Sequence, residues 1–191
     1  MLSPCSEADT DAILEIVNDA ATSYLGVIPL DFSHEPYMSR EELDAEIAAG
    51  VSFSGFLEGG VLVGVMGIQH VSDVTLIRHA YVRSSHQRRG IGAVLLAELR
   101  TQAGERPLLV GTWAGAHWAI DFYERNGFRL QSAAETERLL STYWDIPTPP
   151  GCGVRRVGRR ASVTVNRRHA RSTRPNSSNR RIQWRSADGL S

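Results

Sequence analysis

The sequence predicts an α/β (α+β) fold, with a mixed, mostly antiparallel central sheet and helices on both faces. Three consecutive strands are expected between residues 51 and 82, because β-branched and apolar residues are frequent there and turn signals separate the runs. A helical pattern then separates the third strand from another apolar strand at 108–113. Strands joined by a helical crossover lie parallel, so the sheet is expected to be mixed.

Two helices are expected before these strands. Ser6-Glu7-Ala8-Asp9 can cap the first helix, in which apolar residues recur at helical spacing. Ser39 and Glu42 form a capping box at the start of the second helix, and Gly50 is placed to end it. Both helices therefore have a start signal that does not depend on the rest of the fold.

The three strands are expected at 51–57, 61–69 and 74–82. Glu58-Gly59-Gly60 predicts a hairpin between the first two. The elements expected after the third strand alternate between helix and strand: a helix from Ala93 to Arg100, a strand at 108–113, a helix at 116–125, a strand from Phe128 and a helix at 135–143.

Charge divides the chain into two unequal parts. Residues 1–146 contain 10 arginines and 20 acidic residues, a balance of −10, whereas residues 147–191 contain 11 arginines and one acid, a balance of +10. The sequence contains no lysine. We therefore predict one domain at 1–146 and an arginine-rich tail at 147–191, which has too few apolar residues to form a core and is expected to be disordered.

Three interpretations of the tail stay open. It could bind nucleic acid or another anionic surface, or fold back on the acidic domain. It could also be an altered carboxyl terminus produced by a reading-frame change in a GC-rich gene. Within it, only Ala161-Ser162-Val163-Thr164-Val165 resembles a strand.

The cellular compartment is predicted from what the sequence lacks. The two cysteines, Cys5 and Cys152, fit neither a disulfide framework nor a metal-binding spacing. Met1-Leu2-Ser3-Pro4 does not begin a signal peptide, and no apolar run is long enough to cross a bilayer. We expect a soluble, cytoplasmic protein with no bound metal and no membrane partner.

The turn between the third strand and the next helix is a candidate anion site. The first amide groups of a helix have no partner within the helix, and the helix dipole places partial positive charge there. Gly90 and Gly92 lack a Cβ atom and would allow a phosphate to approach the backbone. Arg88 and Arg89 add guanidinium groups that bind phosphate well.

The same residues resemble a known family. Gln87-Arg88-Arg89-Gly90-Ile91-Gly92 matches the Gln/Arg-x-x-Gly-x-Gly/Ala loop of the GNAT (GCN5-related) N-acetyltransferases. Downstream, the segment from Trp118 to Phe128 is similar to that family's second signature, which contains Ala119, Phe122-Tyr123-Glu124 and Gly127-Phe128 here. The resemblance covers roughly Ser6 to Trp144, and the two motifs together are specific.

The resemblance implies a GNAT-like acyl-CoA N-acyltransferase fold and acetyl-CoA as cosubstrate. Backbone amides of the glycine loop would hold the pyrophosphate, and the third strand would pair with the pantetheine arm as a peptide strand does. One of its amides would also polarise the thioester carbonyl. The cofactor-binding residues are expected to be Ala80, Tyr81, Val82, Gln87, Arg88, Arg89, Gly90, Ile91, Gly92 and Ala93.

Tyr123 matches the family's general acid. A phenol is protonated at neutral pH and could donate a proton to the departing thiolate. The alternative is a packed aromatic residue beside Phe122. The chain departs from the family at Ala116, where many relatives have an asparagine that contacts the cofactor; His117 or Trp118 could replace it.

His79 is the first candidate for the general base, since an imidazole can accept a proton near neutral pH. The alternative is a hydrogen-bonded structural histidine. Strand alternation predicts His79 on the face of Ile77 and Tyr81, opposite Arg78 and Ala80. Three further residues are weaker candidates for the base, and a chain of water molecules could replace it altogether; these residues are Glu58, Asp73 and His70.

In the family, the first helical region forms part of the acceptor pocket. The candidate contacts in this chain are Tyr24, Phe32, His34, Tyr37 and Met38, although aromatic residues also pack without binding anything. The acidic domain would favour a cationic acceptor at long range. Amino acids, polyamines, aminoglycosides and protein amino termini remain open as acceptors.

The resemblance therefore predicts an acetyl-CoA-dependent N-acetyltransferase that acts on a primary amine of a small molecule, by direct attack in a ternary complex. Two alternatives remain: a nucleic-acid-binding protein that acts through the tail, and a catalytically silent acyl-CoA-binding module. Nucleic acid is expected as a partner only of the tail, and a homodimer is compatible with the sequence.

Overall fold

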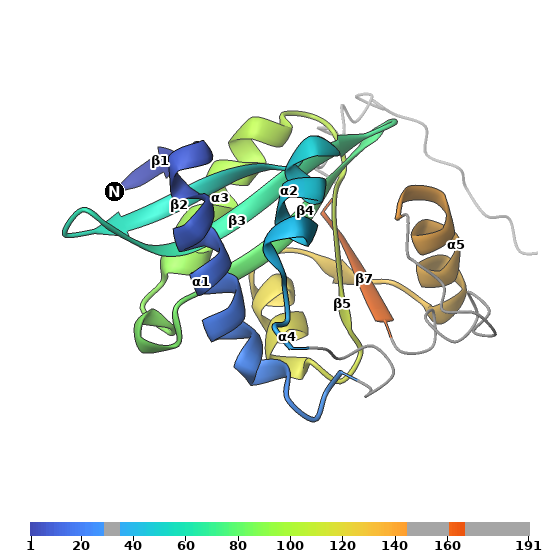
Figure 1. Cartoon of the computed structure of the whole chain (residues 1–191). Coiled ribbons are helices and arrows are strands. Elements are labelled where there is room, and N and C mark those ends of the chain that lie inside the picture. The colour runs from blue at the N-terminus through green and yellow to red at the C-terminus, as the bar shows by residue number, and fades with distance from the viewer. Residues whose placement is uncertain (29–34, 145–160, 167–191) are drawn as a thin grey trace, which may run out of the picture.

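A computed structural model describes residues 1–28 and 35–144 and the backbone of 161–166. Seven strands form one sheet in the order β1-β2-β3-β4-β5-β7-β6 (Figure 1). The strands are β1 (Leu2–Pro4), β2 (Ser52–Glu58), β3 (Val61–Val71), β4 (Val74–Val82), β5 (Leu108–Trp113), β6 (Arg129–Leu130) and β7 (Ala161–Asn166). The helices are α1 (Thr10–Ala21), α2 (Arg40–Ala48), α3 (Ile91–Ala103), α4 (His117–Arg125) and α5 (Ala133–Tyr143).

The sheet is mixed, as predicted. β4 and β5 pair in parallel, and the other neighbouring strands pair antiparallel. Helix α3 connects the parallel pair, which is the crossover that parallel strands require. The predicted fold class is confirmed.

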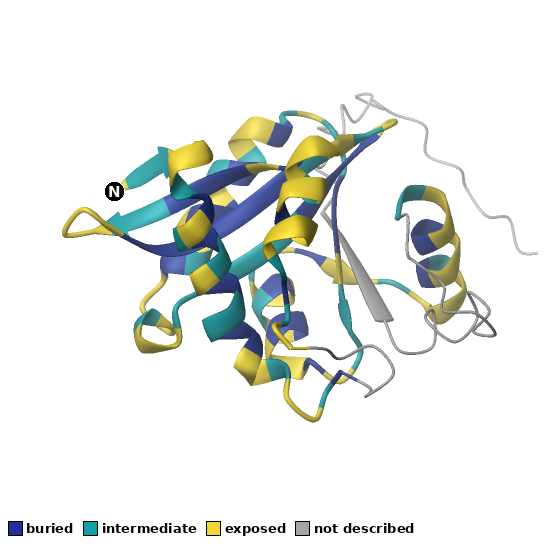
Figure 2. Cartoon of the chain, in the orientation of Figure 1, coloured by how far each residue is buried: buried dark blue, intermediate teal, exposed yellow. Residues whose placement is uncertain are grey.

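Helices cover both faces of the sheet, as Figure 1 shows. On one face, α1 and α2 bury Ile16 and Leu43 against β2 and β3, and α5 buries Leu139 against β4 and β5. On the other face, Leu95 of α3 and Tyr123 of α4 pack in a second core. Figure 2 shows buried residues along the middle strands and exposed residues on the outer sides of the helices.

The predicted capping signals are present. The Ser39 side chain accepts a hydrogen bond from the N–H of Glu42, and the Glu42 carboxylate accepts one from the N–H of Ser39. Asp9 accepts a hydrogen bond from the N–H of Ser6 in the short 3-10 turn that precedes α1. Side-chain caps thus satisfy an amide group in the first turn of α2 and close the turn before α1.

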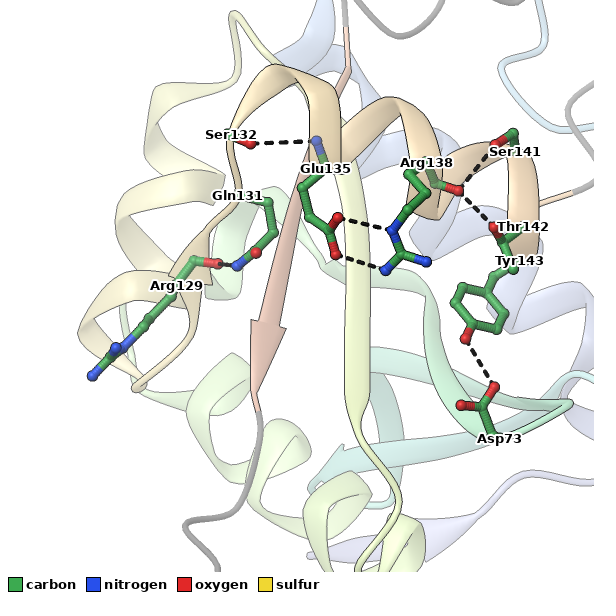
Figure 3. A network of polar contacts seen from close by, with 9 residues as sticks. All are labelled: Asp73, Arg129, Gln131, Ser132, Glu135, Arg138, Ser141, Thr142 and Tyr143. Atoms are coloured by element: carbon green, nitrogen blue, oxygen red, sulfur yellow. Dashed lines mark hydrogen bonds and ion pairs between the residues drawn. The ribbon is translucent and has the colours of Figure 1, made fainter.

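Helix α5 is anchored at its end to the turn between β3 and β4 (Figure 3). The Tyr143 hydroxyl donates a hydrogen bond of 2.8 Å to Asp73 in that turn. Glu135 and Arg138 form a two-pronged ion pair on the exposed side of the helix, with N···O distances of 2.7 and 2.8 Å. The anchor places the last turn of α5 beside the outer end of β4.

Two strands fall where the prediction was incomplete. β1 was not expected, since Leu2–Pro4 is too short to show a period; it pairs with β2, and the terminal amine donates to the carbonyl of Leu57. The strand-like stretch at 161–165 is confirmed as β7, which lies between β5 and β6. The rest of the predicted tail, with Cys152, lies outside the described residues, and the division into domain and tail stays a prediction.

Two further findings concern the described part of the chain alone. Within it, none of the helices combines the length and the apolar character needed to cross a membrane. Across residues 1–28 and 35–144, no cluster of three or more His, Cys, Asp or Glu side chains is arranged to hold a metal ion.

The close approach of β3 and β4 at Gly67 generates a stability prediction. A Cβ atom at Gly67 would lie 2.9 Å from the Arg78 carbonyl oxygen and 2.9 Å from Val51, so Gly67→Ala must push the strands apart. We expect a loss of about 1–3 kcal/mol in the free energy of unfolding, measured by chemical denaturation. Gly111→Ala is the control, because its Cβ would meet only Trp144 at 3.4 Å or more; equal losses in the two variants would contradict the prediction.

Candidate active site

The site begins where β4 and β5 part. The two strands pair over only three residues each, ending at Ile77 and Val110. Beyond this point β5 continues beside β7, while β4 continues beside β3 as far as Val82. The second half of β4 thus has a strand partner on one edge only among the described residues. An open strand edge can bind an extended group through its backbone.

A β-bulge lies directly after the parting. Between the pairs Val65–Tyr81 and Gly67–Arg78, β3 contributes one residue and β4 contributes two, His79 and Ala80. His79 has a positive φ of 47°, a conformation that non-glycine residues rarely adopt. The bulge places strained backbone at the open edge of β4, which is typical of functional sites.

The bulge corrects the prediction about His79. Simple alternation placed it with Ile77 and opposite Arg78, and this is wrong. Both Arg78 and His79 contact Glu46 on α2, whereas Ile77 packs in the core beneath α3. The extra residue shifts the alternation by one position, so two consecutive side chains reach the α2 face. The predicted placement of His79 with Tyr81 is confirmed, since both contact residues of the α1 and α2 face.

The glycine loop opens on the other side of the sheet. Gly90 precedes α3 with a φ of 84°, and a Cβ atom there would meet no atom within 4 Å. Outside the helices, the described backbone offers no acceptor to the N–H groups of Arg88, Arg89 and Gly90, whereas the N–H of Ala93 donates to the Gly90 carbonyl at 3.0 Å. Exposed, convergent amide groups at a helix N-terminus form a site that suits a phosphate group.

The two arginines of the loop differ in their surroundings. Arg89 forms a two-pronged ion pair with Glu58 of β2, at 2.7 and 3.1 Å, and His86 lies 3.3 Å from the same carboxylate. Arg88 is exposed and has a positive φ of 60°. The Glu58 carboxylate is therefore engaged by two side chains of the loop. Glu58 lies at the end of β2, in the β2–β3 hairpin, and not beside the bulge.

Tyr123 on α4 lies in the core beneath the parted strands. Its ring is 5 % exposed and packs edge-to-face with Phe122 and Phe128, at centroid distances of 5.1 and 5.3 Å. Burial raises the pKa of Tyr123 well above its usual range, and the neighbouring Tyr24 raises it further. The phenol is therefore protonated at neutral pH and available as a hydrogen donor.

Four tyrosines gather around the parted strands from both faces. Tyr81 of β4 donates a hydrogen bond of 3.0 Å to the hydroxyl of Tyr37, and both rings lie within 6.5 Å of Tyr24. Burial is the main cause that raises the pKa values of Tyr24, Tyr37 and Tyr81, and Tyr123 contributes to the rise at Tyr81. These mutual effects indicate that the four hydroxyls lie close together.

At the start of α4, Ala116 is fully buried and offers no side-chain hydrogen bond to the helix. Trp118 is 43 % exposed, and its ring meets Tyr24 at a centroid distance of 5.3 Å. His117 is exposed. Of the two residues considered as replacements for the missing asparagine, Trp118 belongs to the aromatic group and His117 does not.

A cavity of about 680 Å³ lies on the α2 face, opposite the glycine loop. It lies between α2 and the end of α5, over strands β3, β4 and β5. Its lining combines apolar and aromatic side chains with two carboxylates, an arginine and a histidine. The lining residues that matter below are Tyr37, Glu42, Glu46, Arg78, His79 and Trp113.

The candidate acceptor contacts divide into three groups. Tyr37 and Met38 line the cavity. Tyr24 stacks on Tyr37 with an interplanar angle of 13° and so supports the lining from behind. Phe32 and His34 lie outside the described residues.

Two of the weaker candidates for the base are held elsewhere. His70 Nδ1 lies 2.9 Å from the hydroxyl of Thr75, and Asp73 accepts the hydrogen bond from Tyr143 that anchors α5. Neither residue lines the cavity. His79 lines the cavity and is also one of the two residues of the bulge. It is therefore the candidate for the base that lies at both features.

Sequence reasoning missed several residues of the cavity. Glu46, Arg78 and Trp113 line it but belong to no motif. Arg78 was visible as a charged residue in an otherwise apolar strand, which is a signal that a buried partner exists. No comparable signal was available for Trp113, whose place depends on the path of β5 after the parting.

Comparison with known proteins supports the assignment of the two motifs. Residues 52–130 match the family model of the acetyltransferase (GNAT) domain. None of the curated proteins matches the sequence.

Several solved structures share the fold. The PaiA N-acetyltransferase from Thermoplasma acidophilum, in complex with coenzyme A, is 16% identical, with a TM-score of 0.63 over 88% of this chain and 98% of that one. The ribosomal-protein-alanine N-acetyltransferase from Brucella melitensis is 26% identical, with a TM-score of 0.55 over 69% of this chain and 86% of that one. The ribosomal-protein-S18-alanine N-acetyltransferase from Escherichia coli is 19% identical, with a TM-score of 0.58 over 86% and 90%.

The tyrosine group generates a prediction about alkaline pH. Folding raises the pKa values of these phenols, so above about pH 10 the unfolded chain loses protons first and the folded state loses stability. The stabilising contribution is thus complete below pH 10 and is lost as the pH rises. We expect the free energy of unfolding, measured by urea denaturation between pH 8.5 and 11.5, to fall steeply above pH 10.

Because the sequence contains no lysine, no ammonium side chain titrates in this pH range and adds to the measured change in stability. Burial raises the pKa of Cys5 to about 11, which acts in the same direction, so the experiment uses a Cys5→Ala background. In that background, Tyr81→Phe should reduce the slope of the free energy of unfolding against pH by up to about 1.4 kcal/mol per pH unit. An unchanged slope would show that folding does not raise the pKa of the Tyr81 phenol.

Proposed function

Because the chain carries an acetyltransferase (GNAT) domain, we propose that it transfers an acetyl group from acetyl-CoA to a primary amine. One observation carries the proposal: an open amide loop on one face and a polar cavity on the other meet at the bulged, half-paired edge of β4. A thioester that reaches this edge from the loop would be accessible to an amine in the cavity.

The glycine loop is proposed to bind the diphosphate of the cosubstrate. The N–H groups of the loop from Gln87 to Ala93 and the exposed Arg88 would supply donors and positive charge. The open backbone of Ala80, Tyr81 and Val82 would pair with the amides of the pantetheine arm. Within the loop, Ile91 is buried and fixes the start of α3 in the core, which keeps the amides in place.

The chemistry is proposed to be direct attack. The amine nitrogen forms a bond to the thioester carbon, the carbon–sulfur bond breaks, and the thiolate takes a proton from Tyr123. The nitrogen in turn loses a proton to a base, for which we propose His79. Tyr123 suits the role because burial keeps its phenol protonated.

The acceptor is proposed to be a primary amine of a small molecule. A cavity of about 680 Å³ is within the range that holds small ligands. The carboxylates of Glu42 and Glu46 in its lining favour an ammonium group over an anion. A protein amino terminus is the competing acceptor class, since two of the solved structures with this fold bear the name of a ribosomal-protein-alanine N-acetyltransferase.

Release of free thiol from acetyl-CoA tests the proposal. The full chain is incubated with acetyl-CoA and a panel of amines that contains amino acids, polyamines, aminoglycosides and a peptide with an amino-terminal alanine. Thiol release with at least one amine, together with the acetylated product by mass spectrometry, is the expected result. Release with the peptide alone would reject the small-molecule acceptor, and release with none would reject the acetyltransferase activity.

Gly92→Asp separates cosubstrate binding from folding. Asp in the first turn of α3 is favoured by the helix dipole, so the thermal stability should be unchanged or slightly higher. Its charge would repel a bound diphosphate, and we expect Kd for acetyl-CoA, measured by calorimetry, to rise at least about tenfold. Gly92→Ala is the control and should change Kd by less than about threefold. Unchanged affinity in the Asp variant would contradict the diphosphate site.

Tyr123→Phe tests the general acid. The substitution removes the hydroxyl and keeps the edge-to-face packing of the ring with Phe122 and Phe128. We expect kcat to fall about 100-fold or more, while Kd for acetyl-CoA and the melting temperature stay nearly constant. Equal activity of the variant and the wild type would assign Tyr123 to packing alone.

A further inference from the structure

Three residues at the bulge form a charged unit inside the cavity wall. Arg78 Nη2 donates to both oxygens of Glu46, at 2.5 and 2.6 Å, and Arg78 Nη1 donates to Gln69 at 3.0 Å. His79 Nε2 lies 3.3 Å from Oε2 of the same carboxylate. The side chains of Arg78, His79 and Glu46 are only 21%, 14% and 26% exposed, so their charges interact with little screening by water.

The carboxylate of Glu46 is held in its charged form. Burial alone would raise the pKa of Glu46, but the contacts with His79 and Arg78 outweigh this effect and lower the pKa from its usual value. Arg78 is permanently charged and binds both oxygens, so it orients the carboxylate as well. Glu46 therefore presents a fixed negative charge to one nitrogen of the His79 ring.

The ring of His79 is held on its other sides too. It stacks on Phe53 with a centroid distance of 6.0 Å and an interplanar angle of 28°. Its Nε2 atom is buried and meets Oε2 of Glu46 as a 3.3 Å charge contact without hydrogen-bond geometry, and Nδ1 makes no hydrogen bond to any described residue. Because His79 lines the cavity while Nε2 is covered, Nδ1 is the nitrogen that an acceptor in the cavity can reach.

We infer that Glu46, oriented by Arg78, is a positioning residue that keeps the His79 proton on Nε2 and the lone pair on Nδ1, facing the acceptor. The partner of one imidazole nitrogen decides which tautomer is present. When Nδ1 takes the proton that the amine nitrogen loses on forming its bond to the thioester carbon, the imidazolium that forms is stabilised by the carboxylate 3.3 Å from its other side. The inference rests on the proposed function and assigns Glu46 a part in it.

The bulge explains why His79 and Arg78 can share one carboxylate. In a regular strand, consecutive side chains point to opposite faces. The positive φ of His79 turns its ring onto the face that Arg78 already occupies. Asn and Gly also tolerate this conformation, so the ring can be removed without loss of the backbone geometry.

A double-mutant cycle on kcat tests the inference. Glu46→Gln keeps the shape and removes the charge, and should lower kcat about tenfold or more. His79→Gly keeps the bulge and should lower kcat about 100-fold. If Glu46 acts through His79, the double variant should resemble His79→Gly within about threefold. Additive losses, near 1000-fold, would assign Glu46 a separate role and overturn the inference.

The matched control is Glu41→Gln, the same chemical change on the exposed side of the first turn of α2, which should leave kcat unchanged. Affinity for acetyl-CoA should be unaffected by Glu46→Gln. A large loss of that affinity or of the melting temperature would instead indicate a structural role for the carboxylate.

A second measurement does not depend on activity. Nitrogen-15 shifts of the imidazole groups, with the His79 signals identified by their absence in His79→Asn, should show the Nε2–H tautomer in the wild type and its loss in Glu46→Gln. An Nδ1–H tautomer in the wild type would reject the inference. If no amine supports thiol release, the proposed function fails, and the tautomer still decides whether Glu46 positions His79.

Discussion

The arrangement of the site depends on the backbone hydrogen bonding of β4. Up to Ile77, β4 pairs on both edges, with β3 and β5. Beyond it, β5 no longer pairs with β4 and stays paired with β7 along its other edge, so the second half of β4 keeps one partner. An unpaired strand edge normally invites association or needs protection. Here the edge lies between an amide loop and a cavity, and its free backbone groups are those proposed to pair with the pantetheine arm.

The bulge makes the two faces of this edge chemically different. Toward α3, Ala80 and Val82 are small or apolar and pack beside the core, as a passage for a flexible arm requires. Toward α2, Arg78 and His79 are polar and lie in the cavity wall. A regular strand could not place two neighbouring polar residues on one side. The strain at His79 therefore accompanies the separation of a polar face, with the proposed base, from an apolar face.

The motifs and most of the elements could be predicted because their signals are local. The capping box at Ser39, the hairpin glycines and the Gly90 turn each depend on a few neighbouring residues. β1 and the face of His79 could not be predicted, since the first is too short to show a period and the second depends on a register shift between two strands. Glu46 was equally hidden, because a glutamate on a capped helix shows no sign that it contacts a strand 32 residues away.

Strand β7 belongs to the arginine-rich segment, so its position in the sheet shows what one part of that segment does. Its backbone pairs with β5 along six residues and with β6 along two, in the stretch of the segment that resembles a strand. Without β7, Gly111–Trp113 would lack the partner that they have in this sheet. Within the arginine-rich segment, residues 161–166 are therefore a part of the central sheet.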